Sequence, residues 1–402
     1  MITYGAYESY VAPLHHPCVV LSLSTASAQT VERGLVRKQV DLGLFVLKQG
    51  AQGGSNITIS PYSIHSALML LRLGAKGDVA RQLDEKLLPQ PLSPDEEGGY
   101  ADLNNQISVT NEKVQSTLAN SVWLKTGHPF TKSYLDASTR IFASEPRAVD
   151  FEKPEAARVT INEWVSSKTN ALISTLLAPG TVTSQTTCVL VNALYFKSAW
   201  LNPFDKVFTK ESDFWTSPTT SVKTPMMWRS DTMGYFEDDA WQGVHLPYQA
   251  YDFLFVALVP KERRSVSEVA NSLSSELLGR AFEESQFTKV NLSLPRFKAR
   301  FSTELMGALE GYGLTKLRGG DYTGISPQGV GGVDAVIHEA VVSVDEGGTE
   351  AAAATAVMMA KGALMPNPPQ PKEVRFDRPF VFALVHRSSK APLFMGIVGD
   401  PR

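Results

Sequence analysis

The segment from Glu346 to Met365 combines a glycine pair and four consecutive alanines, and a proline-rich stretch from Pro366 to Pro371 follows it. Side chains of a β-strand alternate between its two faces, so every second residue from Thr349 to Thr355 would share one face of a strand. Those four residues are two threonines and two alanines, which a tightly packed sheet could admit without overpacking. The one charged residue of this stretch, Glu350, would lie on the other face. The same composition also suits an exposed alanine-rich helix or a linker, because alanine favours helix.

The chain carries no signature of catalysis or metal binding. It has no Gly-x-Ser-x-Gly turn, no phosphate loop ending in Gly-Lys-Ser/Thr, no Cys-x-x-Cys and no dinucleotide fingerprint. His338-Glu339 is not followed by a second histidine at the spacing of a zinc-protease helix. We therefore expect a protein that is not an enzyme, with no catalytic residue, no metal site and no cofactor.

The bulk composition is that of a globular protein with a full-sized core. Of 402 residues, 43% are hydrophobic and 20% are charged. The 38 basic and 41 acidic residues are mixed along the chain, so no basic block predicts a nucleic-acid partner. No apolar run approaches the ~20 residues of a membrane span, so no membrane partner is expected. Cys18 and Cys188 are predicted to be unpaired thiols, with a single bridge between them as the alternative.

Helices are expected mainly early in the chain and strands late. Apolar spacing predicts helices over Val31–Gln49 and Ala156–Leu177, and Ser60-Pro61 supplies the cap and first turn of a buried helix ending at Gly74. Pro89–Gly99 is expected to be a loop. Strands are predicted at Leu118–Leu124, Cys188–Phe196, Phe253–Val259, Val290–Leu294, Ile337–Val344, Phe380–Val385 and Leu393–Val398. Because no linker separates the two kinds of element, we expect a single α+β domain.

Residues 1–30 are predicted to be an N-terminal extension, disordered or signal-like, to a domain covering residues 31–402. Cys18–Ala28 (CVVLSLSTASA) is a weak apolar run that ends in small residues, as a signal peptide does, but no Lys or Arg precedes it. An extracellular location is the prediction, and a cytoplasmic one is the alternative.

From about Val31 to Pro401 the chain resembles the serpin family of protease inhibitors. The hinge of that family is similar to Glu346-Gly347-Gly348-Thr349-Glu350-Ala351-Ala352-Ala353-Ala354, which follows a valine-rich strand here. Further motifs match in order and spacing: Asn56–Ile64, Leu73–Gly77, Val191–Lys197 with Trp200 and Pro203-Phe204, Leu294–Phe297, Asp321–Ile325, Arg378–Phe380 and Pro392–Gly396. Each motif alone is weak, whereas their combination is very specific.

The resemblance implies a single-domain fold with three β-sheets, about nine helices and an exposed reactive-centre loop over about residues 346–372. It also implies suicide inhibition of a serine, or alternatively a cysteine, endopeptidase. The protease cleaves the loop, forms an acyl-enzyme and is trapped when the freed loop inserts into the main sheet. The expected partner is a trypsin-like serine protease, and the inhibitor is expected to be a monomer. A non-inhibitory serpin, acting as a carrier or chaperone, is the alternative, although such members usually lose the small-residue hinge that this chain keeps.

Two clusters near the main sheet also follow from the resemblance. Glu346 and Arg296 occupy the positions of the breach, where an ion pair would hold the top of the sheet until insertion begins. An ordinary surface ion pair, worth under about 1 kcal/mol, is the alternative. The polar shutter beneath the parting strands would consist of Ser60, Ser63, Asn192 and His338. Buried polar groups are hydrogen-bonded, so this cluster could hold two strands together and re-pair when they separate.

The reactive bond is predicted at Lys361-Gly362. A lysine side chain suits the acidic pocket of a trypsin-like protease, whereas glycine offers a pocket no side chain. Counting seventeen residues from Glu346, as is usual in the family, ends at Gly362 and makes Gly362-Ala363 an elastase-like alternative. A later bond at Leu364 or Met365 is the remaining possibility.

Overall fold

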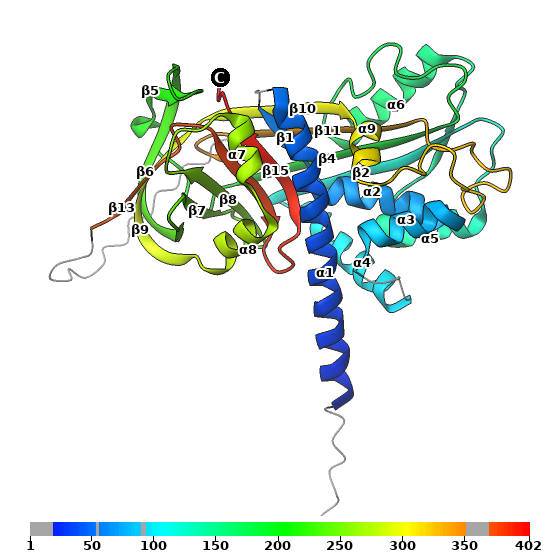
Figure 1. The fold of residues 1–402 in the computed structure, drawn as a ribbon, viewed down its shortest axis with the longest axis horizontal. Helices are drawn as coiled ribbons and strands as arrows, with labels where there is room; N and C mark the ends of the chain where they lie inside the picture. The colour runs from blue at the N-terminus through cyan, green and yellow to red at the C-terminus, as the bar shows by residue number, and fades with distance from the viewer. Residues whose placement is uncertain (1–18, 54–55, 90–93, 351–369) are drawn as a thin grey trace, which may run out of the picture.

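The computed structural model describes residues 19–53, 56–89, 94–350 and 370–402. That part of the chain contains nine α-helices, two short 3-10 helices and fifteen strands, which form two hydrogen-bonded sheets within one α+β domain (Figure 1). None of the helices there is long and apolar enough to cross a membrane.

The helices lie mostly in the first half of the chain, as predicted. They are α1 (Val19–Gly50), α2 (Pro61–Gly74), α3 (Gly77–Leu87), α4 (Pro94–Ile107), α5 (Lys132–Phe142), α6 (Pro154–Lys168), α7 (Val266–Ser272), α8 (Ser275–Glu283) and α9 (Met306–Gly311), with η1 at Ala51–Gly53 and η2 at Lys206–Phe208. The start of α2 is confirmed, because the Ser60 hydroxyl accepts the N–H of Ser63 and Pro61 occupies the first turn. Its predicted end at Gly74 is confirmed too.

Three helix boundaries differ from the prediction. Helix α1 begins at Val19 rather than Val31 and projects away from the sheets at its N-terminal end (Figure 1). Helix α6 ends at Lys168 rather than Leu177, because Asn170 and Ala171 adopt left-handed backbone angles that a helix cannot continue through. The expected loop at 89–99 contains the start of α4, since proline is tolerated in a first turn. The division of the chain at residue 30 stays a prediction.

The six-stranded sheet has the order β10-β11-β12-β4-β2-β3. Its strands are β2 (Val114–Lys125), β3 (Arg147–Val149), β4 (Cys188–Ala199), β10 (Phe297–Glu304), β11 (Ala335–Val344) and β12 (Gly348–Thr349). Helix α6 packs on one face through Ile161 and Val165, against Val191 of β4 and Ile337 of β11. The predicted strand of β4 is buried on both faces along most of its length, as its continuous apolar sequence indicated.

The nine-stranded sheet unites what the resemblance described as two separate sheets. Its long strand β6 pairs with β5 through its first residues, with β9 through its middle and with β7 through its last ones. The remaining strands follow in the order β7-β8-β14-β15-β1 on one side, and β13 lies beyond β9. The strands are β1 (Ile57–Ile59), β5 (Lys210–Trp215), β6 (Ser221–Glu237), β7 (Trp241–Pro247), β8 (Phe253–Pro260), β9 (Gln286–Pro295), β13 (Lys372–Arg375), β14 (Phe380–His386) and β15 (Pro392–Val398).

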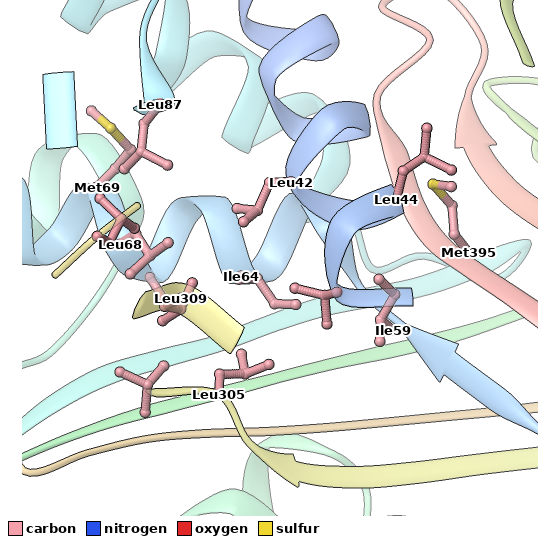
Figure 2. Close-up of a cluster of buried hydrophobic side chains, with 14 of the residues drawn as sticks. Leu42, Leu44, Ile59, Ile64, Leu68, Met69, Leu87, Leu305, Leu309 and Met395 are labelled. Carbon is pink, nitrogen blue, oxygen red and sulfur yellow. The ribbon is translucent and has the colours of Figure 1, made fainter. Parts of the chain in front are cut away.

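The largest core cluster lies between helices and strands that are distant in sequence. Figure 2 shows Ile64 and Leu68 of α2 packed among Leu42 of α1, Leu309 of α9 and other aliphatic side chains. Cys188 is also buried in this cluster as a free thiol, and burial raises its pKa, so the prediction of an unpaired cysteine is confirmed for this residue. Cys18 lies outside the described residues.

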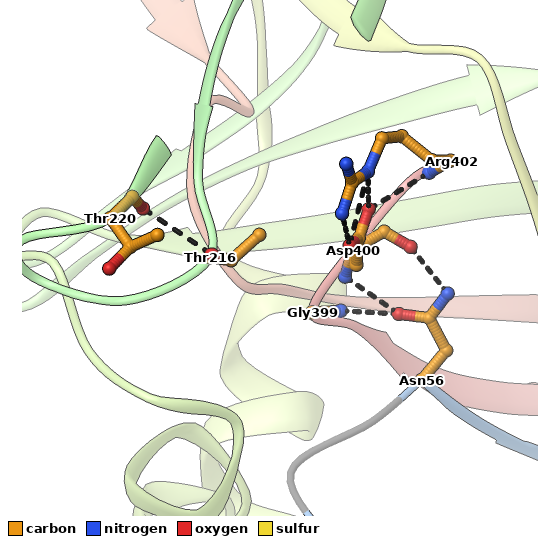
Figure 3. Close-up of polar contacts among 6 residues, drawn as sticks. All are labelled: Asn56, Thr216, Thr220, Gly399, Asp400 and Arg402. Atoms are coloured by element: carbon orange, nitrogen blue, oxygen red, sulfur yellow. Dashed lines mark hydrogen bonds and ion pairs between the residues drawn. The ribbon is translucent and has the colours of Figure 1, made fainter. Parts of the chain in front are cut away.

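The C-terminus is fixed to the start of β1 by one side chain. The Asn56 Oδ1 accepts the backbone N–H groups of Gly399 and Asp400, and its Nδ2 donates to the Asp400 carbonyl (Figure 3). Arg402 pairs with the Asp400 carboxylate beside these bonds. The last residues of the chain are therefore part of the folded domain.

Candidate functional site

The six-stranded sheet is closed at one end of the β4–β11 pair and parted at the other. The two strands pair in parallel from Ala335↔Val189 to Ala340↔Leu194. Beyond that point the two-residue strand β12 lies between them and pairs antiparallel with both. The structure therefore places the first residues of the predicted hinge inside the sheet.

A tight turn after β11 delivers the chain into this gap. The Asp345 carboxylate accepts the N–H groups of Gly347 (2.8 Å) and Gly348 (3.2 Å), and the Asp345 N–H donates to the Gly348 carbonyl (3.0 Å). Gly348 has φ +152°, and a Cβ there would lie 2.3 Å from the Ser198 carbonyl oxygen. Only glycine fits this position, both for its backbone angle and for its close approach to β4.

Thr349 is held in the gap by a residue that sequence reasoning missed. Its Oγ1 is hydrogen-bonded to the Tyr248 hydroxyl at 2.6 Å, and its side chain is buried. The Tyr248 ring stacks on Trp200 with ring centroids 4.6 Å apart. Trp200 in turn donates its backbone N–H to the Gly347 carbonyl and its indole N–H to the Asp345 carbonyl. Tyr248 and Trp200 therefore form a platform on which the hinge rests.

Strand β12 ends at Thr349, and Glu350 is the last described residue of the predicted hinge. Its N–H still donates to the Ser343 carbonyl at 3.1 Å, but its φ of +51° is left-handed and departs from a strand. A left-handed non-glycine residue costs roughly 1–2 kcal/mol, so this backbone is strained. The side chain is half-buried, and burial raises the pKa of its carboxyl group. Four predicted hinge residues (Ala351–Ala354) and the candidate reactive-bond residues (Lys361, Gly362, Ala363) lie outside the described residues.

The two predicted breach residues form an ion pair at the top of the gap. Arg296 approaches the Glu346 carboxylate through Nε at 2.7 and 2.8 Å and through Nη2 at 2.5 Å. Thr209 donates a third hydrogen bond to the same carboxylate. Burial alone would raise the pKa of Glu346, but the bonds from Arg296 and Thr209 hold it below its ordinary value. Because the Glu346 side chain is only 3% exposed, removing Arg296 would leave a buried carboxylate without its counter-charge.

The four predicted shutter residues lie together in a buried hydrogen-bonded cluster. Asn192 Nδ2 donates to Ser63 Oγ at 2.5 Å and to Asn120 Oδ1 at 2.7 Å. His338 Nε2 accepts the Ser60 N–H at 3.1 Å, so its Nδ1 carries the proton and donates to Asn192 Oδ1. All these side chains are buried, and the cluster ties β4 and β11 to the N-terminal turn of α2.

Two further buried polar residues belong to this region and were not predicted. Asn120 pairs in register with Asn192, and Asn192 with His338, so these three side chains form one row across β2, β4 and β11. A lone asparagine inside the apolar strand Leu118–Leu124 was the available signal. The next residue of β11, Glu339, has a fully buried side chain that pairs with Arg300 at 2.7 Å. Burial raises the pKa of Glu339.

The shutter histidine should make stability depend on pH. Burial lowers the pKa of His338 to about 3, whereas an unfolded histidine titrates near 6.5. Below about pH 6.5 the unfolded chain therefore binds more protons than the folded chain does. The contribution of neutral His338 to the free energy of unfolding is complete above that pH and is lost as the pH falls toward 3. Between pH 6.5 and 5 the loss should be about 1.5 kcal/mol. Melting temperatures should fall less steeply over this range in His338→Gln than in the wild type. Equal slopes would contradict the buried neutral histidine.

Comparisons with known proteins agree over nearly the whole chain. The family model described as Serpin (serine protease inhibitor) matches residues 37–401. Leukocyte elastase inhibitor of Bos taurus is 34% identical over 376 residues, covering 91% of this chain and 98% of the relative. Serpin B4 of Homo sapiens is 31% identical over 369 residues, covering 86% of this chain and 94% of the relative.

A solved structure supports the same fold. The structure of human thyroxine-binding globulin superposes with a TM-score of 0.82 at 24% identity, covering 93% of this chain and 99% of that one. The nine helices of the described residues and their single α+β domain agree with the fold that the sequence motifs implied. The chain belongs to the serpin family.

Proposed function

We propose that this serpin is an irreversible suicide inhibitor of a trypsin-like serine endopeptidase. The observation that carries the proposal is the seating of Gly348–Thr349 between β4 and β11, antiparallel to both. A strand that starts in this position and direction points along the seam where the two strands still pair with each other. Release of the loop at a cut bond would let the same strand grow downward between them.

Continuing the register of β12 along the seam places the small residues on the buried side. Every second residue after Thr349 would face the side of the sheet on which α2 and the shutter lie. Thr355 would then stand opposite both His338 and Asn192, and its hydroxyl could replace their mutual hydrogen bond. The alternation of small side chains from Thr349 to Thr355 fits this crowded face, where larger residues would overpack the core.

The energy for insertion would come from the sheet and from the hinge. One parallel pairing between β4 and β11 would be exchanged for two antiparallel ladders, which are slightly more stable per residue and double the number of inter-strand bonds. Glu350 would leave its left-handed conformation for an extended one and lose its strain. Each added hydrogen bond contributes about 1 kcal/mol net, so about ten of them outweigh the loss of a few shutter contacts.

Trapping requires a covalent link to the protease before the loop moves. The catalytic serine of the protease would attack the carbonyl carbon of Lys361. The Lys361–Gly362 amide would break, Gly362 would leave with a new amino group, and an ester would join Lys361 to the enzyme. Insertion would then carry Lys361 and the attached enzyme away from Gly362, and it would distort the enzyme before water could hydrolyse the ester.

The carrier function remains the second candidate, because the structural neighbour named for thyroxine binding has the same fold. Two observations favour inhibition. The hinge keeps Gly348, Thr349 and the four alanines that follow Glu350, and the two sequence relatives named above carry serpin or elastase-inhibitor names. The elastase in one of these names also supports Gly362–Ala363 as the alternative reactive bond. An extracellular location stays a prediction.

Cleavage inside the loop should make the protein more heat-resistant. About ten added hydrogen bonds predict a rise in melting temperature on the order of 10–20 °C. The loop is cut with a protease that does not become trapped, and intact and cut samples are compared by scanning calorimetry. A carrier whose cut loop stays outside the sheet would melt at an unchanged or lower temperature.

Thr349→Arg should convert the inhibitor into a substrate. An arginine at this buried position between β4 and β11 would lose the Tyr248 bond and bury a charge, which costs at least about 2 kcal/mol and should lower the trapped fraction tenfold or more. Detergent-resistant complex and cleaved product are quantified on denaturing gels. Glu350→Arg, on the opposite face, is the matched control and should keep most of the trapping. Equal trapping by Thr349→Arg and the wild type would refute the hinge assignment.

Lys361→Ala should abolish the reaction with trypsin while leaving any reaction with elastase. Trypsin-like pockets bind a basic side chain, and no basic residue other than Lys361 occurs between Glu350 and Lys372. Mass spectrometry of the peptide released from the wild-type complex locates the cut bond independently. Release of a fragment beginning at Ala363 would move the reactive bond to Gly362–Ala363.

A further inference from the structure

Three large apolar side chains gather on the surface beside the hinge. The described residues expose six large hydrophobic side chains, and Val207 (69% exposed), Phe208 (48%) and Trp228 (37%) account for half of them. The rings of Phe208 and Trp228 meet edge to face with centroids 5.6 Å apart. We call these three residues the aromatic patch. Exposed apolar groups that gather in one place mark interaction surfaces more often than those scattered singly.

The fold explains why these side chains point outward. Trp228 follows the fully buried Met227 in β6, and strand alternation places these two side chains on opposite faces. Val207 and Phe208 lie on the short 3-10 helix η2, which has no buried residue. Their sequence neighbours Phe204 and Arg229 instead contact each other, with the Arg229 Cζ 4.8 Å from the centroid of the Phe204 ring. The aromatic patch is therefore an outer layer that packing of the core does not require.

The aromatic patch lies near both described stretches that flank residues 351–369. At one end, Thr209, next to Phe208, donates to the Glu346 carboxylate, and the Phe204 N–H donates to the Glu346 carbonyl. At the other end, Trp228 pairs in register with Ser293 of β9, and Ser293 with Arg375 of β13. Adjacent strands are about 4.8 Å apart, so Trp228 stands roughly 10 Å across the sheet from the strand into which that segment leads.

We propose that the aromatic patch is a docking surface for the body of the protease that cleaves the loop. The inference rests on the proposed function, because it assumes that a protease engages the segment 351–369. Lys361 is nine residues from Gln370, a reach of at most about 30 Å of extended chain. A protease domain of ~230 residues has a radius of gyration of about 17 Å, so its full width exceeds that reach and an enzyme bound at Lys361 could contact the surface beside the loop ends.

The chemistry of the aromatic patch defines the partner's side of this contact. Two aromatic rings and a valine offer an apolar, shape-specific surface without a titratable group. Binding energy at protein interfaces concentrates on such buried aromatic side chains. The docked protease should therefore present an apolar surface outside its active-site cleft, and selectivity among proteases with the same primary specificity would depend on that surface.

The test compares a patch variant with a matched control variant. Phe208→Ser combined with Trp228→Ser removes both rings, whereas Phe287→Ser removes an aromatic ring that is 79% exposed elsewhere on the nine-stranded sheet. The second-order rate of covalent complex formation with trypsin should fall at least tenfold in the double variant and stay within twofold in the control. The rate at which the same trypsin cleaves a free peptide of residues 346–372 measures recognition of the loop without the aromatic patch. An unchanged rate in a folded double variant would overturn the proposal.

A second measurement separates this inference from the proposed function. Binding of trypsin with its catalytic serine replaced by alanine requires docking but no trapping, and it should weaken in the double variant. If the wild type traps no active trypsin, but the double variant binds the inactive trypsin more weakly than the wild type does, the proposed function is wrong and the docking surface is supported. Sedimentation velocity tests a second copy of the chain as the occupant. A wild-type dimer that the double variant abolishes, with no change in trypsin binding, would overturn the proposal in favour of self-association.

Discussion

The structure depends on one seam that is only partly closed. Strands β4 and β11 pair directly over Ala335–Ala340, and beyond that stretch they accept Gly348–Thr349 between them. An ordinary parallel sheet would pair the two strands along their whole length. The breach pair and the Tyr248 platform make contacts at the parted end of this seam, whereas the shutter links β4 and β11 where they pair directly.

The two faces of the seam are covered in different ways. On one side, α6 and the chain that follows it pack apolar residues such as Ile161 and Leu177 across β4 and β11. On the other side, the shutter brings hydrogen-bonding side chains from Ser60 to His338. An apolar contact can slide with little penalty, whereas buried hydrogen bonds must be exchanged for others. The positions at which a third strand could lie between β4 and β11 therefore depend on the hydrogen bonds of the shutter side.

The parts of this arrangement that follow local rules could be predicted from the sequence. The serine cap and proline of α2 and the apolar strand of β4 are short patterns with a direct physical meaning. Tyr248, Asn120 and the exposure of Trp228 could not be predicted, because each depends on which strands become neighbours. The predicted end of α6 was wrong because the left-handed residues Asn170 and Ala171 end the helix without the glycine that usually marks such an end.

The position at which sheet pairing stops explains why a parted sheet can persist. Thr349 gains a buried hydrogen bond and pairs with two strands, so the first step into the gap is favourable.

The next step of insertion would straighten Glu350 and move its half-buried carboxylate. Later steps would separate β4 from β11 and finally Asn192 from His338. The gain from new ladders comes only after several residues have entered, whereas the shutter must open first. In the proposed mechanism, a chain still connected at both ends would not supply those residues. The order in which bonds break and form would then account for the end of β12 at Thr349, and cutting the loop would change that order.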